Sequence, residues 1–327
     1  MIKDGKIIKD GHYDIISRTM PDDSGLQDLL LGLANELKGD QIYNTGFKTL
    51  DKLIGGGLRK RMLSIVAGPA GNGKSYFAYK VFLHMLENEI DVLYLPLENT
   101  HKDTLRRIIS SYFNSWKMID VSKDQAQARI DLFEKPEFRS WAMKMQENVC
   151  RNPSRLMVDT EGKPFIPGIP FDEFTCLLHE LAPRSDVIII DPITKLDQSL
   201  NKGAKHVQEE QFVKDIKAIA ESNECHIMMV SHTGKRQKHK GEEVKLAVDD
   251  LSGSVAWSRF CQYVLLLDYH GEETSKVINR VGAKTDTEHR RTLKIAKVND
   301  GMGKGQHIAF DFKDGASMEE LGLIVKE

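Results

Sequence analysis

Eight consecutive residues match the G-x-x-x-x-G-K-S pattern of a phosphate-binding loop, or P-loop: Gly68, Pro69, Ala70, Gly71, Asn72, Gly73, Lys74 and Ser75. The glycines let neighbouring backbone N–H groups point toward one phosphate, and the N-terminus of the helix that follows adds a favourable dipole. Lys74 can reach the β- and γ-phosphates, and the Ser75 hydroxyl can join the ligands of Mg²⁺. The spacing therefore predicts a binding site for a nucleoside triphosphate and its Mg²⁺ ion.

Two carboxylates follow apolar segments that read as strands. Asp191 ends the strand expected at 186–191, and from this position an aspartate of a P-loop protein holds Mg²⁺, usually through a water. An aspartate can also simply end a buried strand, but the P-loop upstream favours the metal role. Glu98 follows the segment 91–97, where it could orient or deprotonate the attacking water or cap the helix expected from about Thr100. The residues alone leave both interpretations of Glu98 open.

A histidine and a cluster of basic residues follow the strand expected at 226–231. His232 stands where a polar side chain could contact the γ-phosphate and report hydrolysis, although a solitary histidine is more often structural. The next residues form a basic loop that contains Lys235, Arg236, Lys238 and Lys240. Such a run is usually only solvated, but at this edge of the sheet it could bind a polyanion in a salt-dependent manner.

A second polar loop is expected at 200–206, between Asp191 and a helix at 207–221. It carries Lys202 and Lys205. Neither basic loop contains an aromatic side chain on which a nucleic-acid base could stack. Any DNA contact made there is therefore expected to be with phosphates.

The elements that must position these residues alternate between strand and helix from Asn44 onward. Short apolar segments separated by helical stretches indicate a buried, mostly parallel sheet, and a helix is expected at 76–86 after the P-loop. Strands are expected at 62–67, 91–97, 155–159, 186–191, 226–231, 262–268, 292–298 and 306–312. The turn-rich residues 299–303 join the last two. The predicted fold class is α/β, a twisted sheet flanked by helices with an antiparallel C-terminal edge hairpin.

Bulk composition narrows the function classes. The chain has 327 residues and a formal net charge of −2, so one large α/β domain is expected and any nucleic-acid surface must be local. Four well-separated cysteines with no C-x-x-C pair argue against a zinc site or a disulfide framework. No apolar signal segment or membrane-length run is present, which predicts a cytoplasmic protein without a membrane partner.

Residues 1–43 are expected to form an N-terminal extension ahead of a domain at 44–327. Within it a helix is expected at 24–38, because six apolar residues fall on one helical face: Leu26, Leu29, Leu30, Leu33, Ala34 and Leu37. This face must be buried, either on the chain's own core or on a neighbouring subunit. The sequence leaves both open.

Taken in order, several segments resemble the C-terminal ATPase domain of the DnaB-like replicative helicases, a hexameric family with a RecA-like P-loop fold. The segment 45–58 is similar to the one that leads into the family's P-loop. Residues 97–107 resemble the stretch with the catalytic glutamate, and 187–191 match the Mg²⁺ strand. Ser231 and His232 resemble the phosphate sensor, 250–254 resemble a DNA-facing loop, and 294–299 resemble the strand that reaches a neighbour's nucleotide. The match covers about residues 44–315.

The resemblance implies ATP and Mg²⁺ as ligands and assigns a role to each matching position. Lys74, Glu98, His232 and Lys297 would be catalytic, Arg107 would join the P-loop in binding nucleotide, and Ser75 and Asp191 would hold Mg²⁺. Single-stranded DNA would meet Lys202, Lys205, Lys235, Arg236, Lys238, Lys240, Ser252 and Gly253. Further implied partners are other copies of the chain, in a hexamer, and a primase or loader.

Two departures from the family pattern affect these assignments. The family's late motif reads Lys-x-Arg, and here Lys297 keeps the lysine while Asn299 stands at the arginine position. Asparagine cannot supply the positive charge that such an arginine brings to a neighbour's γ-phosphate, so Lys297 or another basic residue takes the role or the activation is weak. Only 1–43 precede the core, so the chain resembles compact phage- or plasmid-type helicases without a collar or primase domain. Helix 24–38 would then be the family's subunit-docking linker helix.

Three functions fit these features to different degrees. The resemblance favours a ring-forming, ATP-dependent helicase or translocase that acts on single-stranded DNA in replication. The missing collar and arginine also fit a RecA- or RadA-like recombination or repair ATPase that forms filaments on DNA. A KaiC-like signalling ATPase would bind a protein and no nucleic acid, which the basic loop argues against.

Overall fold

The protein is described from a computed structural model, which divides the chain into two compact units, 1–41 and 42–327. The described residues are 2–3, 6–7, 41–99, 101–112, 136, 139–140, 169–196, 202–233, 246–248, 251, 255–279, 281–313 and 317–325. In the first unit, β1 (Ile2–Lys3) and β2 (Lys6–Ile7) pair antiparallel. The helix predicted at 24–38 and the strand predicted at 155–159 lie outside the described residues, so both stay predictions.

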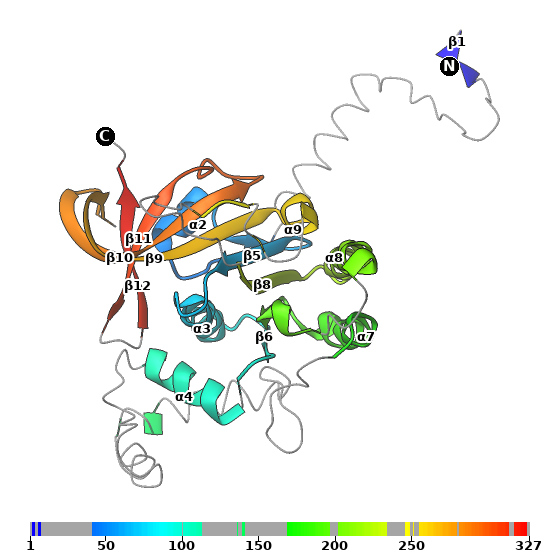
Figure 1. Ribbon diagram of the computed structural model, residues 1–327, viewed down its shortest axis with the longest axis horizontal. Helices are drawn as coiled ribbons and strands as arrows, with labels where there is room; N and C mark the ends of the chain where they lie inside the picture. Colours follow the sequence, from blue (N-terminus) through cyan, green and yellow to red (C-terminus); the bar gives the residue numbers. More distant parts are fainter. Residues whose placement is uncertain are drawn as a thin grey trace. The chain divides into compact units, whose positions relative to one another are not determined.

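An eight-stranded sheet with the order β10-β11-β12-β9-β5-β8-β7-β6 forms the centre of the second unit (Figure 1). Five of its strands run parallel, namely β5 (Leu63–Gly68), β6 (Val92–Pro96), β7 (Val187–Asp191), β8 (His226–His232) and β9 (Tyr263–Ile278). Each of the first four is buried along almost its whole length, because both faces of the sheet are covered. The predicted parallel sheet is confirmed.

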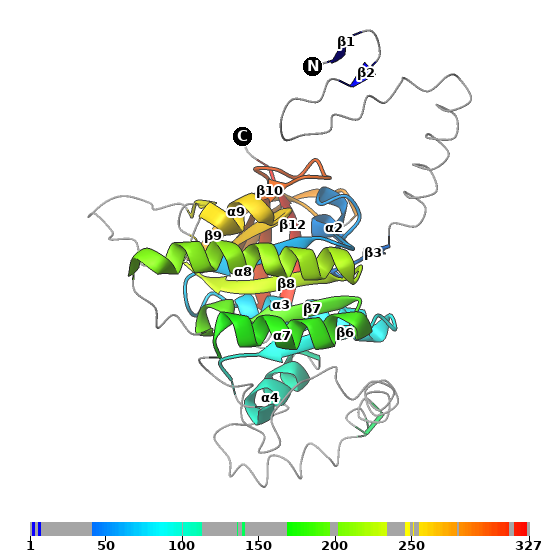
Figure 2. The same cartoon turned by 90° about the vertical axis from the view of Figure 1, so that its right-hand side faces the viewer.

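Helices cover both faces of this sheet. One face packs on α2 (Lys48–Leu53), α3 (Lys74–Glu87) and α4 (His101–Tyr112), and the other on α7 (Phe171–Leu181), α8 (Lys202–Ser222) and α9 (Val255–Phe260). Figure 2 shows α7 and α8 side by side across the second face. Along β5, Val66 faces the core on the α3 side of the sheet, while Ile65 and Ala67 face the core on the α8 side. This alternation is expected because successive side chains of a strand point to opposite faces. None of the described helices is long and apolar enough to cross a membrane.

One loop prediction is wrong. Residues 202–206 form the first turns of α8, so Lys202 and Lys205 lie on a helix and not in a polar loop. The sequence there lacks a strong start signal, and the polar residues of this segment continue the helix without interruption.

The C-terminal strands form an antiparallel assembly larger than the predicted hairpin. β10 (Lys284–Val298) pairs with β9 and with β11 (His307–Lys313), and β12 (Ser317–Ile324) pairs with β11 and with the far end of β9. These four strands therefore close on one another and form the C-terminal cap. The predicted hairpin at 299–303 is confirmed, whereas β12 and the outer halves of β9 and β10 were not predicted.

The segment that leads into the P-loop is anchored by two buried carboxylates. Asp51 accepts hydrogen bonds from the Thr45 amide at 2.9 Å and from its hydroxyl at 2.7 Å, and burial raises the pKa of Asp51 to about 6. Glu320 on β12 accepts bonds from the amides of Thr49 and Leu50, the first turn of α2. These bonds tie the segment to the C-terminal cap.

Candidate nucleotide site

The P-loop joins the end of β5 to the start of α3 at the carboxyl edge of the parallel strands. Two of its glycines adopt left-handed backbone angles, with φ of +82° at Gly71 and +97° at Gly73. A β-carbon at Gly73 would lie 2.9 Å from side-chain atoms of both Phe312 and Met318, so the position has no room for a larger residue. The loop therefore depends on its glycines and is supported from outside by the C-terminal cap.

Lys74 is buried, and its ammonium group is turned back over the loop. Its Nζ donates a hydrogen bond of 2.7 Å to the Pro69 carbonyl oxygen. Burial lowers the pKa of Lys74 to about 8, although Asp191 and Glu98 act in the opposite direction. An anionic phosphate group would stabilise this buried ammonium group, and the N-terminus of a helix also favours an anion. These residues therefore fit the phosphates of a nucleotide.

Asp191 lies at the end of β7, next to the P-loop serine. Burial raises the pKa of Asp191, while hydrogen bonds from Tyr94 and Ser75 and the charge of Lys74 oppose this shift. A serine hydroxyl beside a carboxylate is an oxygen-donor pair that fits Mg²⁺. No cluster of three or more His, Cys, Asp or Glu able to hold a metal occurs within the described ranges.

Glu98 reaches the same region from the end of β6. Its carboxylate lies 3.6 Å from Nε2 of His232 and 3.3 Å from Nζ of Lys195. Burial lowers the pKa of His232, and the charge of Lys74 adds to the effect while Glu98 opposes it. The lowered pKa favours the neutral form of His232 at neutral pH. A neutral imidazole can form a hydrogen bond either with Glu98 or with an oxygen atom of a bound ligand.

The structure brings five of the predicted residues together, namely Lys74, Ser75, Glu98, Asp191 and His232. Two other predicted residues, Lys297 and Arg107, lie on β10 and α4, and their roles stay predictions. Lys297 pairs with Val264 near the start of β9, and its Nζ donates to the Arg259 carbonyl at 3.2 Å. Burial lowers the pKa of Lys297. Arg107 lies on α4 and acts electrostatically on the Tyr79 hydroxyl of α3.

The remaining predicted DNA contacts stay predictions. Lys235, Arg236, Lys238, Lys240, Ser252 and Gly253 lie outside the described residues. Lys202 and Lys205 belong to the first turns of α8, and only their backbone is described.

Three residues at the site were not found from the sequence. Tyr94 holds Asp191, Lys195 contacts Glu98, and the Arg291 side chain on β10 donates to the Asn72 carbonyl oxygen of the P-loop at 3.0 Å. Tyr94 reads as one more strand residue and Arg291 as a surface residue of a polar strand. Only the three-dimensional sheet brings them to the P-loop.

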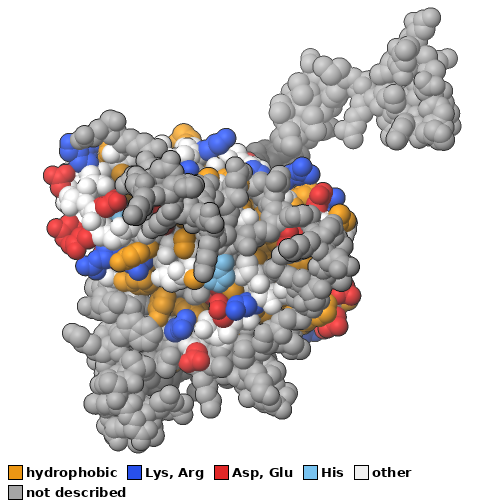
Figure 3. All heavy atoms as spheres, in the orientation of Figure 1, with side chains coloured by type: hydrophobic (Ala, Val, Ile, Leu, Met, Phe, Trp, Pro, Cys, Tyr) orange, Lys and Arg blue, Asp and Glu red, His pale blue; other side chains and the backbone are white. Residues whose placement is uncertain are grey.

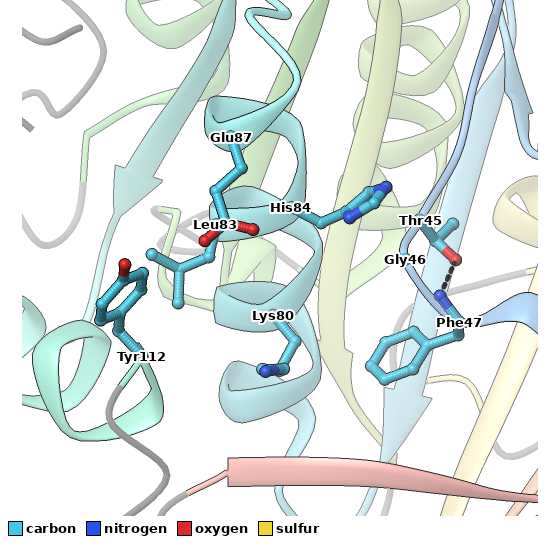
Figure 4. Close-up of a pocket in the computed structure, with 8 residues that line it drawn as sticks. All are labelled: Thr45, Gly46, Phe47, Lys80, Leu83, His84, Glu87 and Tyr112. Carbon is cyan, nitrogen blue, oxygen red and sulfur yellow. Dashed lines mark hydrogen bonds between the residues drawn. The ribbon is translucent and has the colours of Figure 1, made fainter. Parts of the chain in front are cut away.

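A pocket of about 450 Å³ lies at the opposite end of α3 (Figure 4). Its lining consists of Thr45, Gly46, Phe47, Lys80, Leu83, His84, Glu87 and Tyr112. The described walls include no P-loop residue. This pocket is therefore separate from the nucleotide site.

Asp191→Asn is expected to separate stability from function. The pKa of Asp191 is higher in the folded protein than in the unfolded chain. Burial of the ionised carboxylate therefore lowers the free energy of unfolding in full at pH above the folded pKa, and has no such effect at pH below the unfolded pKa. At neutral pH the variant should therefore melt no lower than the parent, while Mg²⁺-dependent ATP hydrolysis falls at least about tenfold. Thermal melting and steady-state ATPase assays over a Mg²⁺ series measure both effects.

The matched control is Asp215→Asn on α8, where Asp215 accepts a surface hydrogen bond from Gln211. Unchanged Mg²⁺ dependence in Asp191→Asn would contradict the metal role.

Comparisons with known proteins agree with this fold. A solved ATPase domain superimposes with a TM-score of 0.65 at 19% identity, covering 92% of this chain and 100% of that one. A DnaB-like replicative helicase, solved in a study of its interactions with primase, superimposes with a TM-score of 0.65 at 17% identity, covering 97% of this chain and 69% of that one. These similarities confirm the predicted RecA-like fold. A sequence search of curated proteins found no match. A family model described as an AAA domain matches residues 35–238, and the chain therefore belongs to the AAA domain family.

Proposed function

We propose that this protein is an ATP-dependent helicase or translocase that acts on single-stranded DNA in replication. The observation that carries the proposal is the group formed by Lys74, Ser75, Asp191, Glu98 and His232 at one edge of the sheet. The fold shared with a solved ATPase domain and with a DnaB-like replicative helicase supports it. The corresponding setting is the cytoplasm.

The roles of the residues follow from their positions. The P-loop amides and Lys74 would bind the phosphates, and Ser75 and Asp191 would hold Mg²⁺, which would supply positive charge to the phosphate oxygens. Glu98 orients the attacking water, and Lys195 restrains its carboxylate. His232 contacts Glu98 and continues directly into the basic loop at 235–240. Loss of the γ-phosphate would thus be transmitted from His232 to a DNA-binding segment.

We also propose that the active form is a homo-oligomer, a hexamer in the manner of the family. Lys297 donates to the Arg259 carbonyl oxygen of its own chain, and the resemblance gives this lysine a role at a neighbouring subunit's nucleotide. The apolar face predicted for helix 24–38 gives one surface for such contacts, and a primase or loader is the further partner that the resemblance implies.

The basic loop is the proposed DNA contact. On the face shown in Figure 3, basic and acidic side chains of the described residues are interspersed and form no continuous positive surface. Changing Lys235, Arg236, Lys238 and Lys240 together to alanine should therefore lower the affinity for single-stranded DNA and flatten its dependence on salt. Fluorescence-anisotropy titrations with an oligonucleotide at several salt concentrations measure both effects. If the quadruple variant keeps the parental affinity and the parental dependence on salt, the basic loop does not contact the DNA.

ATPase assays with and without single-stranded DNA, followed by strand displacement on a forked duplex, test the function itself. We expect DNA to stimulate hydrolysis and ATP to drive displacement of one strand. Stimulation with strand coating but no displacement would indicate a filament-forming ATPase. No stimulation by DNA would contradict the helicase proposal and favour a signalling ATPase.

A further inference from the structure

Arg291 is a buried cation beside the P-loop that the proposed mechanism does not use. It lies on β10 with its side chain 11% exposed. The centre of its guanidinium group is 4.2 Å from the ring centroid of Phe312 and 5.0 Å from that of Tyr269. Its Nη1 lies 3.5 Å from Oδ1 of Asp311. Ring stacking and the carboxylate thus fix the plane of the guanidinium group.

Another donor of this side chain points at the P-loop. Nε of Arg291 donates to the main-chain oxygen of Asn72 at 3.0 Å, in a buried hydrogen bond. In a planar trans peptide, the C=O of one residue and the N–H of the next point in opposite directions. Because the Asn72 oxygen points toward β10, the N–H of Gly73 must point away from β10.

Other contacts hold the same peptide. The Asn72 side-chain amide donates to the Leu267 carbonyl oxygen at 3.3 Å and to Asp268 at 3.4 Å. A β-carbon at Gly73 would lie 2.9 Å from side-chain atoms of Phe312 and Met318. The Asn72–Gly73 peptide is therefore clamped by strands of the C-terminal cap, and Arg291 supplies the bond to its carbonyl group.

We propose that Arg291 is a positioning residue of the nucleotide site, which holds the Asn72–Gly73 peptide so that the Gly73 N–H faces a bound phosphate. The inference rests on the proposed nucleotide-binding function of the P-loop. The guanidinium charge also polarises the peptide and makes its N–H a stronger donor. This contact serves ATP and ADP alike, so its loss weakens binding and leaves the chemical step largely unchanged.

Calorimetric titration of the full chain with MgADP tests the proposal. Arg291→Met keeps a long side chain between the two rings but has no donor, whereas Arg291→Lys keeps a charged donor. We expect the Kd for MgADP to rise about tenfold in R291M and about threefold in R291K, since a hydrogen bond to a charged group is lost only in the first. Arg290→Met is the matched control, because the Arg290 side chain is half-exposed and its Nη2 lies 3.9 Å from the carboxylate of Glu272 on β9. It should bind as the parent does.

Melting temperatures without nucleotide distinguish positioning from packing. Parental Kd values in R291M would overturn the proposal. Equal loss of affinity in R291M and R291K, with parallel falls in melting temperature, would show a packing role and would also overturn it. If R291M does not fold, R291L takes its place because leucine also lacks a donor, and parental binding by R291L counts against the proposal. Absence of MgADP binding by the parent would instead contradict the proposed function itself.

Discussion

Lys74→Ala is expected to abolish measurable ATP binding and turnover. Lys74 is the buried cation at the start of α3, held over the loop by the Pro69 carbonyl oxygen. Without its ammonium group the γ-phosphate of ATP loses its nearest positive charge, and the amides of the loop cannot replace it. We expect catalytic turnover at the background of the assay and a Kd for MgATP raised at least about a hundredfold. Calorimetric titration and phosphate release measure the two quantities.

The stability of this variant separates loss of function from loss of fold. The folded pKa of Lys74, about 8, lies below its ordinary value of 10.5, so burying the charged form costs stability at pH below 8. The cost disappears as the pH rises from about 8 to 10.5. Lys74→Ala should therefore melt no lower than the parent at neutral pH, and its pH dependence over that range should be flatter. Lys80→Ala, on the same helix, is the control and should keep ATP binding. Normal turnover in Lys74→Ala would remove the P-loop from the mechanism.

Glu98→Gln is expected to preserve ATP binding and block hydrolysis. The amide keeps the size of the side chain and its place beside Lys195 and His232, but it cannot accept a proton from water. General base catalysis contributes about 10²–10⁴-fold, so kcat should fall by that factor while the Kd for MgATP stays near the parental value. Single-turnover hydrolysis and nucleotide titration give the two numbers. Glu87→Gln, at the far end of α3, is the control, and rapid hydrolysis by Glu98→Gln would exclude the proposed role.

Much of the fold could be predicted because the parallel strands are buried on both faces. Segments such as Val187–Asp191 are apolar almost throughout, and such runs, bounded by helical stretches, indicate a parallel sheet without knowledge of tertiary contacts. The P-loop was equally clear, since its geometry depends on glycines at fixed spacing.

The C-terminal cap could not be predicted in the same way. The outer halves of β9 and β10 are rich in charged and polar residues, such as those at 270–276 and 284–290, because much of this ribbon faces water. Its strands are held by pairing with one another, as in the register of Thr287 with Ser275, and pairing leaves little signal in the amino-acid sequence. The same reason hid Arg291, whose partner Asn72 lies 219 residues away along the chain.

The order of the sheet has a consequence for where the protein can be divided. The family match ends at residue 238, yet β5 has β8 on one side and β9 on the other, and β9 begins only at Tyr263. A fragment that stopped at the end of the match would leave the strand that carries the P-loop as an open edge, with unpaired backbone amides and carbonyls exposed to water. Such an edge is a template for aggregation. The boundary of sequence similarity is therefore not a boundary of folding, and the strands that follow it are what make the matched part of the chain a self-contained unit.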